Sequence, residues 1–207
     1  MTESQRAIAL PYFALLAVVA LQRLGELVWS RRNLGRITSS AKPQPDRAST
    51  WSGLVLVHAA LVVLPALEFL FFATATSPRV ARAAFAIGIV PFLLAQALRY
   101  WAIGSLGRTW NVRAIVDPSI PVVTRGPYRW IRHPNYLAVL MEFTAVPLAG
   151  CAWRSWIVLQ LVHTPLLVAR IGAEERALRA MSGYREAMEH KGRILPRLFA
   201  RAGSRSR

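Results

Sequence analysis

Long runs of apolar residues, separated by short polar segments, dominate the chain. Residues 7–29, 52–74 and about 80–103 each form such a run. Each run is long enough for a helix that crosses the hydrocarbon core of a membrane, which takes about 20 residues. Single prolines and charged residues inside the runs leave the pattern intact. The pattern therefore predicts three transmembrane helices in the first half of the chain.

Two shorter apolar runs follow in the second half. They cover residues 136–151 and 155–171, and the turn between them lies around Ala152, Trp153 and Arg154. So short a connection joins antiparallel helices. We expect a tight helical hairpin and leave open whether it crosses the whole bilayer. The fold class is then all-α, an integral membrane bundle of about five transmembrane helices.

Arginine and lysine gather in alternate loops. Segments 30–51 and 104–135 and the tail from 170 onward are rich in basic residues, whereas 75–82 and the hairpin turn carry few. Cytoplasmic loops of membrane proteins carry such an excess. Five crossings then place the N-terminus outside and the C-terminus in the cytoplasm. Because a hairpin returns to the side it left, we expect the segments before and after it to meet at the cytoplasmic face of a plasma or inner membrane.

The tail after the hairpin is strongly charged. Its apolar residues, among them Ala173, Ala177 and Met181, recur at helical spacing and predict a juxtamembrane amphipathic helix over about 172–190. The last residues form a basic tail, expected to lie near anionic lipid. We divide the chain into N-terminal membrane helices, a region that carries the candidate chemistry, and this basic tail. The three parts cover residues 1–104, 105–196 and 197–207.

The composition supports a membrane protein. Hydrophobic residues make up 54% and charged residues 17% of the 207 residues, against roughly 25% charged residues in a soluble domain. The basic loops account for the net charge of +16, so we expect membrane lipids as partners and no nucleic acid. Cys151 is the single cysteine, which excludes an intrachain disulfide and a multi-cysteine metal site. We expect no metal.

A basic and aromatic segment, RGPYRWIRHPNYL at 125–137, stands directly before the fourth apolar run. Pro134 suits the first turn of the following helix, and the next two amides would lie at its positive end, which favours an anionic group. Arg132 and His133 stand beside it. This pattern is typical of a pocket for a polar, carboxylate-bearing cofactor. A belt of aromatic and arginine side chains at the membrane interface explains the same composition.

Charged residues at the start of the tail form a second candidate. Arg170 and Glu174 stand four residues apart and share a helix face, and Glu175 follows. In one interpretation the pair supports a binding site, and one carboxylate binds a hydroxyl or ammonium group of the ligand. In the other they form a solvated ion pair, worth about 0–1 kcal/mol. Taken alone, the pattern favours the ion pair.

Ionisable residues inside the apolar runs form a third candidate, because polar groups at membrane depth face a cavity or a partner. They are Glu26, His58, Glu68, Arg99, Glu142 and His163. Glu142 follows Tyr136 by six residues, about 9 Å deeper along a helix. It would act there as a general base or substrate-binding carboxylate, or as a structural partner of an arginine. For Glu68, His58 and His163 we favour structural roles.

The two motifs, in this order and joined by a hairpin, resemble the isoprenylcysteine carboxyl methyltransferase family of membrane enzymes. The matching elements are GPYRWIRHPNYL at 126–137 and RIGAEERAL at 170–178. The resemblance is closer to a bacterial branch that is associated with type III polyketide gene clusters and methylates alkylpyrones or alkylresorcinols. LQRLGELVWSRRN at 21–33 and LGRTWNVRAIV at 106–116 are similar to that branch. The tail MSGYREAM at 181–188 lacks the Phe of the eukaryotic F-G-x-x-Y pattern.

This resemblance implies S-adenosyl-L-methionine as the methyl donor. The residues expected to bind it are Arg132, His133, Pro134, Asn135, Tyr136, Leu137, Glu174 and Glu175. We expect Arg170 to orient the reacting group, and His133 or Glu142 to deprotonate a hydroxyl acceptor. The acceptor is lipophilic: an alkylpyrone or alkylresorcinol hydroxyl, or an isoprenylcysteine-like carboxylate. The alternatives are a membrane NADPH-dependent sterol-type reductase and a non-catalytic lipid-binding protein.

Overall fold

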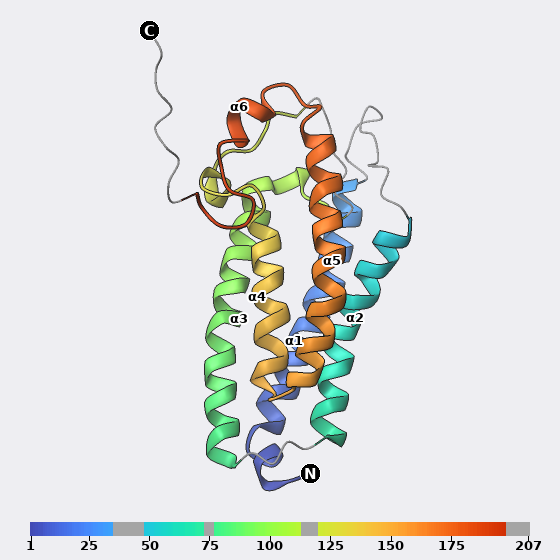
Figure 1. Ribbon diagram of the computed structural model, residues 1–207, viewed down its shortest axis with the longest axis vertical. Helices are drawn as coiled ribbons and strands as arrows, with labels where there is room; N and C mark the ends of the chain where they lie inside the picture. Colours follow the sequence, from blue (N-terminus) through green and yellow to red (C-terminus); the bar gives the residue numbers. More distant parts are fainter. Residues whose placement is uncertain (35–47, 73–76, 113–119, 198–207) are drawn as a thin grey trace.

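The computed structural model describes residues 1–34, 48–72, 77–112 and 120–197. The bundle in these ranges consists of long helices that stand side by side (Figure 1). They are α1 (Glu3–Leu34), α2 (Ala48–Phe71), α3 (Pro78–Leu106), α4 (Pro134–Ala149) and α5 (Trp153–Leu178). The predicted basic tail beyond 197, and the parts of the basic loops within 35–47 and 113–119, lie outside the described residues.

Short elements gather at the end of the bundle where α5 ends. They are the 3-10 turns η1 (Gly107–Thr109) and η2 (Gly126–Arg129) and the helix α6 (Tyr184–Met188). The described ranges contain helices and turns but no strand, apart from one isolated bridge between Ile131 and Gly192. The all-α membrane bundle expected from the sequence is confirmed.

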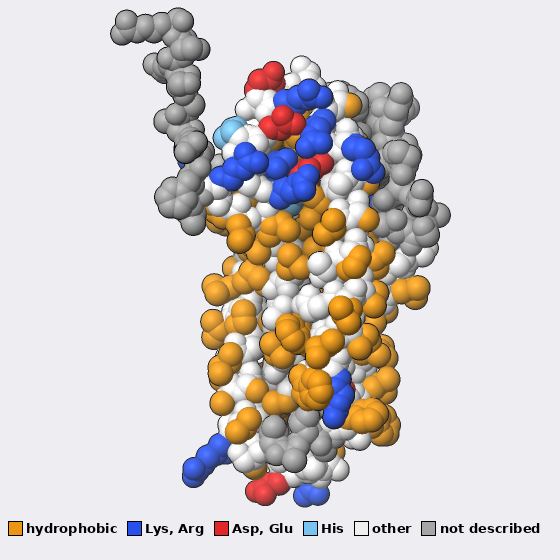
Figure 2. Space-filling model, viewed as in Figure 1, with side chains coloured by type: hydrophobic (Ala, Val, Ile, Leu, Met, Phe, Trp, Pro, Cys, Tyr) orange, Lys and Arg blue, Asp and Glu red, His pale blue; other side chains and the backbone are white. Residues whose placement is uncertain are grey.

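The surface of the bundle matches a membrane environment. Of the described helices, α1, α2, α3 and α5 are each long and apolar enough to cross a bilayer. Figure 2 shows apolar side chains around the middle of the bundle and charged side chains gathered over the end that carries α6. The chain is therefore a multi-pass membrane protein. α4 has 16 residues, which is shorter than the roughly 20 residues that span a bilayer. This agrees with the short apolar run seen at 136–151.

The hairpin turns slightly earlier in the chain than its pattern indicated. α4 ends at Ala149 and α5 begins at Trp153, with Cys151 in the left-handed region at φ 56°. Glu68 of α2 fixes the start of α5, because its carboxylate accepts hydrogen bonds from the backbone N–H of Arg154 (3.2 Å) and Ser155 (2.6 Å). Such first-turn donors have no partner within their own helix. The contacts of Glu68 are those of a structural residue.

The charged tail differs from the prediction of one amphipathic helix over 172–190. Its first part continues α5 without a break to Leu178. The chain then turns, and α6 starts after Gly183, whose φ is 75°. Glycine adopts this left-handed conformation at no steric cost. The periodic apolar residues of the tail therefore pack as two helical pieces, and Tyr184 and Met188 of α6 form a small core with Tyr128 and Ala102.

A close approach between α3 and α4 holds the bundle together. Gly88 of α3 faces α4, where an added Cβ would lie 2.7 Å from the Cβ and 2.8 Å from the Cα of Ala149. Real Cβ atoms do not come this near, so a side chain at position 88 forces the helices apart. Gly104, on the same helix, has open space around it.

We expect Gly88→Ala to lower the stability of the bundle by about 1–3 kcal/mol, the usual cost of overpacking. Gly104→Ala is the matched control, and it should be neutral or stabilising by about 0.5–1 kcal/mol, because glycine weakens a helix interior. Thermal unfolding of both variants in detergent measures the difference. Equal melting temperatures for the two variants would contradict this packing.

Candidate active site

The basic segment before α4 is fastened to the C-terminal segment by its backbone. The N–H of Arg132 donates to the carbonyl of Gly192 (2.9 Å), and the N–H of His133 donates to that of Arg193 (2.8 Å). Lys191 adds a hydrogen bond from Nζ to the carbonyl of Tyr128 (2.8 Å). Burial lowers the pKa of the Lys191 ammonium group. These contacts hold the side chains of Arg132 and His133 at the end of the bundle.

Glu175, near the end of α5, joins four basic side chains. Its carboxylate is almost fully buried and lies 2.9 Å from Nη1 of Arg132, 2.8 Å from Nη2 of Arg193 and 3.5 Å from Nη2 of Arg179. Nε2 of His133 lies 3.3 Å from the same carboxylate. Because a carboxylate accepts hydrogen bonds, Nε2 carries the proton, and Nδ1 keeps a lone pair in the neutral ring.

Tyr136 links the two motifs a second time. Its hydroxyl donates to the carboxylate of Glu174, and Nε of Arg170 donates to the Tyr136 oxygen (3.4 Å). Arg170 also donates from Nη2 to the carbonyl of Val112 (3.1 Å). The structure thus brings together residues 132–136 and 170–175, which the sequence placed on one face of the membrane.

A cavity of about 630 Å³ opens beside these residues, within the range of about 300–1,000 Å³ of small-molecule sites. Six of the residues expected to bind the cofactor or to take part in the reaction lie in its wall: Arg132, His133, Asn135, Tyr136, Arg170 and Glu174. Glu175 braces Arg132 and His133 from outside the wall, and Pro134, Leu137 and Glu142 do not line the cavity either. Beyond the polar end, the wall consists mostly of apolar side chains of α1, α2 and α5.

Two polar atoms at the motif are buried without a hydrogen-bond partner among the described residues. They are Nε of Arg132 and Oδ1 of Asn135, and both residues line the cavity. Buried polar groups are nearly always paired, so each such atom calls for an explanation. Nε of Arg132 is a donor and Oδ1 of Asn135 is an acceptor. Together they suit a ligand that carries both charges and hydrogen-bonding groups.

Two tyrosines complete the polar end of the cavity. Burial raises the pKa of Tyr184 to about 12, although the charge of Arg132 opposes this shift. Burial also raises the pKa of Tyr128, and the nearby charge of Glu174 raises it further. Both phenols are therefore neutral at physiological pH. They offer aromatic surface and hydrogen-bonding hydroxyls to a ligand and do not act as bases.

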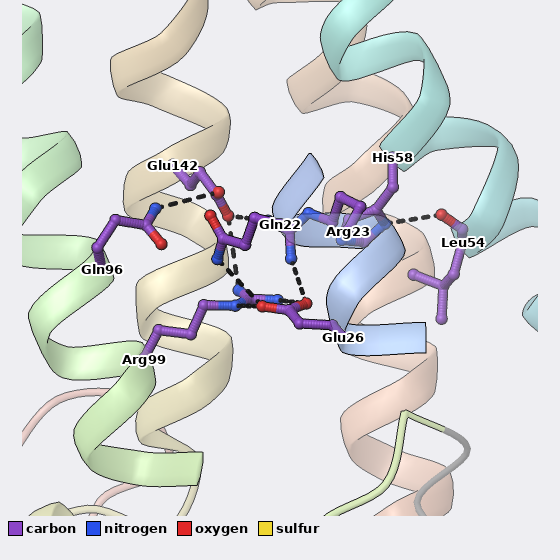
Figure 3. A network of polar contacts seen from close by, with 8 residues as sticks. All are labelled: Gln22, Arg23, Glu26, Leu54, His58, Gln96, Arg99 and Glu142. Atoms are coloured by element: carbon purple, nitrogen blue, oxygen red, sulfur yellow. Dashed lines mark hydrogen bonds and ion pairs between the residues drawn. The ribbon is translucent and has the colours of Figure 1, made fainter. Parts of the chain in front are cut away.

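A second polar cluster lies deeper in the bundle, where Figure 3 shows its members reaching inward from α1, α3 and α4. Glu142 is fully buried and accepts hydrogen bonds from Arg23, from Gln96 (3.2 Å) and from Nη1 of Arg99 (3.5 Å). Glu26 pairs with Nη1 of Arg23 at 2.9 Å and with Nη2 of Arg99 at 2.8 Å. This geometry favours the structural interpretation of Glu142, and its role as a base stays a prediction.

Several contacts of the site were missed from the sequence. Arg193 and Lys191 lie in an irregular segment with no periodic pattern, so nothing in the sequence joined them to Glu175 or Tyr128. The lone charges of Arg99 and Glu26 were visible inside apolar runs, but their pairing across two helices was not. Within the described ranges, no group of three His, Cys, Asp or Glu residues is placed to hold a metal ion.

Comparison with known proteins gives a consistent result. Residues 86–180 match the model of the isoprenylcysteine carboxyl methyltransferase (ICMT) family. The uncharacterized protein YpbQ of Bacillus subtilis (strain 168) is 29% identical over 172 residues, which cover 83% of this chain and 98% of that protein.

Two rice proteins, from Oryza sativa subspecies indica and japonica, are each described as a probable protein-S-isoprenylcysteine O-methyltransferase. Each is 27% identical over 110 residues, which cover 52% of this chain and 57% of the rice protein. The match to the family model includes the segment before α4, the hairpin and the charged end of α5. Residues 86–180, which line much of the cavity, therefore carry the sequence pattern of the isoprenylcysteine carboxyl methyltransferase family.

Proposed function

We propose that this protein is a membrane methyltransferase of the isoprenylcysteine carboxyl methyltransferase family, which transfers a methyl group from S-adenosylmethionine to an oxygen of a lipophilic acceptor. The observation that carries this proposal is the cavity. One continuous space joins charged residues of the two motifs, at the end of the bundle, to an apolar wall within the membrane-spanning part. A polar cofactor and a lipophilic acceptor meet in such a space.

The residues at the polar end fit S-adenosylmethionine. The unpaired Nε of Arg132 suits the carboxylate of its amino-acid part, and Oδ1 of Asn135 accepts a hydrogen bond from a ligand N–H or O–H. Glu174 adds negative charge for an ammonium or a hydroxyl group. Tyr128, Tyr184 and the neighbouring apolar side chains offer a surface for the adenine ring. When bound, the cofactor supplies a methyl group already activated on a sulfonium.

The remaining task of the protein is to align the acceptor and to exclude water. Apolar residues of α1, α2 and α5 serve both purposes, because they admit a lipid-like chain from the bilayer side. A carboxylate acceptor is ionised at neutral pH and requires no base, whereas a phenol with a pKa of about 10 gains from one. Nδ1 of His133 is a candidate base, because Nε2 is the nitrogen that faces Glu175. We favour an alkylpyrone or alkylresorcinol hydroxyl as the acceptor.

The charge distribution supports a cytoplasmic location for the polar end of the cavity. The charged side chains gathered there in Figure 2 belong to the end that the positive-inside rule assigns to the cytoplasm. S-adenosylmethionine would then enter from the cytoplasm, and the acceptor from the membrane. We propose a plasma or inner membrane as the location.

Binding measurements on the purified protein in detergent test the choice of cofactor. We expect saturable binding of S-adenosylmethionine and none of NADPH. Arg132→Ala should weaken this binding by about 10–100-fold, the value of a hydrogen bond to a charged group. Arg129→Ala is the matched control, because this exposed arginine lies over the Trp130 ring and does not line the cavity. Binding of NADPH instead of S-adenosylmethionine would favour the reductase, and binding of neither would favour the non-catalytic lipid-binding protein.

A further inference from the structure

A second set of polar groups lines the same cavity away from the motif. Arg23 of α1, His58 of α2 and His163 of α5 all lie in its wall. His163 and Arg170 share α5 and are seven residues apart, so His163 lies about 10 Å deeper along the helix. This position is within the apolar part of the bundle, where polar side chains are costly unless they face a partner or a cavity.

His163 has no hydrogen bond to the part of the chain that the structure describes. The side chain is fully buried, and both ring nitrogens are without a partner there. Its ring stacks on Phe143, with centroids 3.9 Å apart and planes within 12°. Stacking occupies a face of the ring, whereas the nitrogens lie on the ring edge. Stacking requires only an aromatic ring, so it does not by itself account for a histidine.

Arg23 and His58 offer further hydrogen-bonding atoms to the same space. Nη1 and Nη2 of Arg23 are used by Glu26 and Glu142, but the buried Nε has no partner among the described residues. The His58 ring lies 6.0 Å from that of His163, and its Nδ1 is 2.7 Å from the carbonyl of Leu54. Nδ1 must therefore donate, which leaves Nε2 as an acceptor in the neutral ring.

We propose that Arg23, His58 and His163 form a hydrogen-bonding subsite for a hydroxyl or carbonyl oxygen of the lipophilic acceptor. Arg23 supplies a donor, and the two neutral imidazoles supply both donors and acceptors. A hydroxyl can donate and accept at once, and so satisfies more of these groups than a hydrocarbon does. This inference rests on the proposed function for the identity of the acceptor. It adds that the acceptor carries a second oxygen besides the one that is methylated.

A subsite built for an oxygen rejects a ligand that lacks it, because its buried polar groups then stay unpaired. The ligands for the test are an alkylresorcinol and an alkylphenol with the same side chain, which differ by one hydroxyl. Their binding to the full-length protein is measured in detergent, without cofactor, by ligand-dependent thermal stabilisation. We expect the wild type to bind the alkylresorcinol about tenfold more tightly, the value of one hydrogen bond at the upper end of the neutral range.

His163→Phe keeps the stack on Phe143 and removes both nitrogens, so it should reduce the tenfold preference to near one and leave S-adenosylmethionine binding unchanged. His163→Gln, which retains a donor and an acceptor, should keep part of the preference. His190→Phe is the matched control at an exposed histidine outside the cavity and should behave as the wild type.

An absence of preference in the wild type overturns the proposal whatever the variants do. It is also overturned when His163→Phe melts at a lower temperature but keeps the wild-type preference, because His163 is then a purely structural residue. The readout needs no cofactor, so a failure of the proposed methyl transfer is recognised separately, as a lack of S-adenosylmethionine binding in the wild type.

Discussion

The Glu175→Ala variant is expected to lose about a hundredfold or more in S-adenosylmethionine affinity and to unfold at a clearly lower temperature than the wild type. Glu175 is the shared partner of three basic side chains at the end of the bundle, with Arg132, His133 and Arg193 within 3.3 Å. Arg193 is largely exposed and turns to water when its partner is lost. Arg132 is buried and keeps an unpaired charge, which costs about 3–5 kcal/mol in comparable buried pairs.

The loss of affinity follows from the same contacts. Arg132 and His133 line the cavity, and Glu175 holds their segment against the end of α5. Without this carboxylate, both side chains gain freedom that a bound cofactor would have to remove, and a loss of about 2–3 kcal/mol corresponds to the hundredfold expected. Glu175→Gln, which keeps the shape but not the charge, should fall between the wild type and the alanine variant.

Glu189→Ala provides the control for this prediction. Glu189 also pairs with an arginine, at 3.0 Å from Arg179, but both side chains are about 40% exposed. Exposed pairs of this kind contribute about 0–1 kcal/mol, so the control should melt and bind as the wild type does. The two variants are compared by thermal unfolding with and without S-adenosylmethionine. If Glu175→Ala had the same melting temperature and the same S-adenosylmethionine binding as Glu189→Ala, Glu175 would not organise the site.

The second large effect is expected at Glu142, where Glu142→Gln should destabilise the bundle by about 3–5 kcal/mol. The cluster in Figure 3 contains two carboxylates, Glu26 and Glu142, and two guanidinium groups, Arg23 and Arg99, so its formal charges cancel. Removing one carboxylate leaves a net positive charge within the hydrocarbon region, where an unpaired charge is costly.

A double variant separates this charge effect from other causes. Glu142→Gln combined with Arg23→Gln restores neutrality, and it should recover a substantial part of the stability that the single variant loses. The coupling is read from a double-mutant cycle of unfolding in detergent. Additive losses in the double variant would mean that the pair is not coupled, in contradiction to the geometry.

The same variant tests the role of Glu142 as a base. Turnover of an alkylresorcinol and of a prenylcysteine analogue are compared in Glu142→Gln. A base is required by the hydroxyl acceptor and not by the carboxylate, so a base role predicts a selective loss with the alkylresorcinol. An equal loss with both acceptors indicates that Glu142 positions Arg23 and its neighbours, and undiminished turnover of the alkylresorcinol excludes the base role.

The sequence predicted the parts of this fold that depend on hydrophobic runs. Apolar runs located α1, α2 and α3, and the short turn expected around Ala152, Trp153 and Arg154 located the hairpin to within a few residues. The break after Leu178 was not predictable from periodicity, because the apolar residues of the tail keep helical spacing on both sides of it. The second helical piece starts after Gly183, whose left-handed conformation becomes visible only in three dimensions.

The candidate site was predictable to the extent that topology alone brings residues together. A hairpin returns the chain to the face it left, and this placed His133 and Tyr136 beside Glu174 and Glu175, which they contact in the structure. The position of Glu142 outside the cavity wall was not predictable, because depth along a helix does not give the direction of a side chain. The unpaired nitrogens of His163 likewise require the packing of Phe143 and α5 to be known.

Methyl transfer from S-adenosylmethionine to a lipophilic oxygen acceptor is tested most directly with purified protein in detergent. The protein is incubated with S-adenosylmethionine that carries a radiolabelled methyl group and with an alkylresorcinol, an alkylpyrone or a prenylcysteine analogue. We expect label in the organic-soluble product, identified as a methyl ether of the alkylresorcinol or alkylpyrone, and a loss of this product with Glu175→Ala but not with Glu189→Ala. Binding of S-adenosylmethionine without transfer to any of these acceptors, or label that appears equally with the Glu175→Ala protein, would contradict the account.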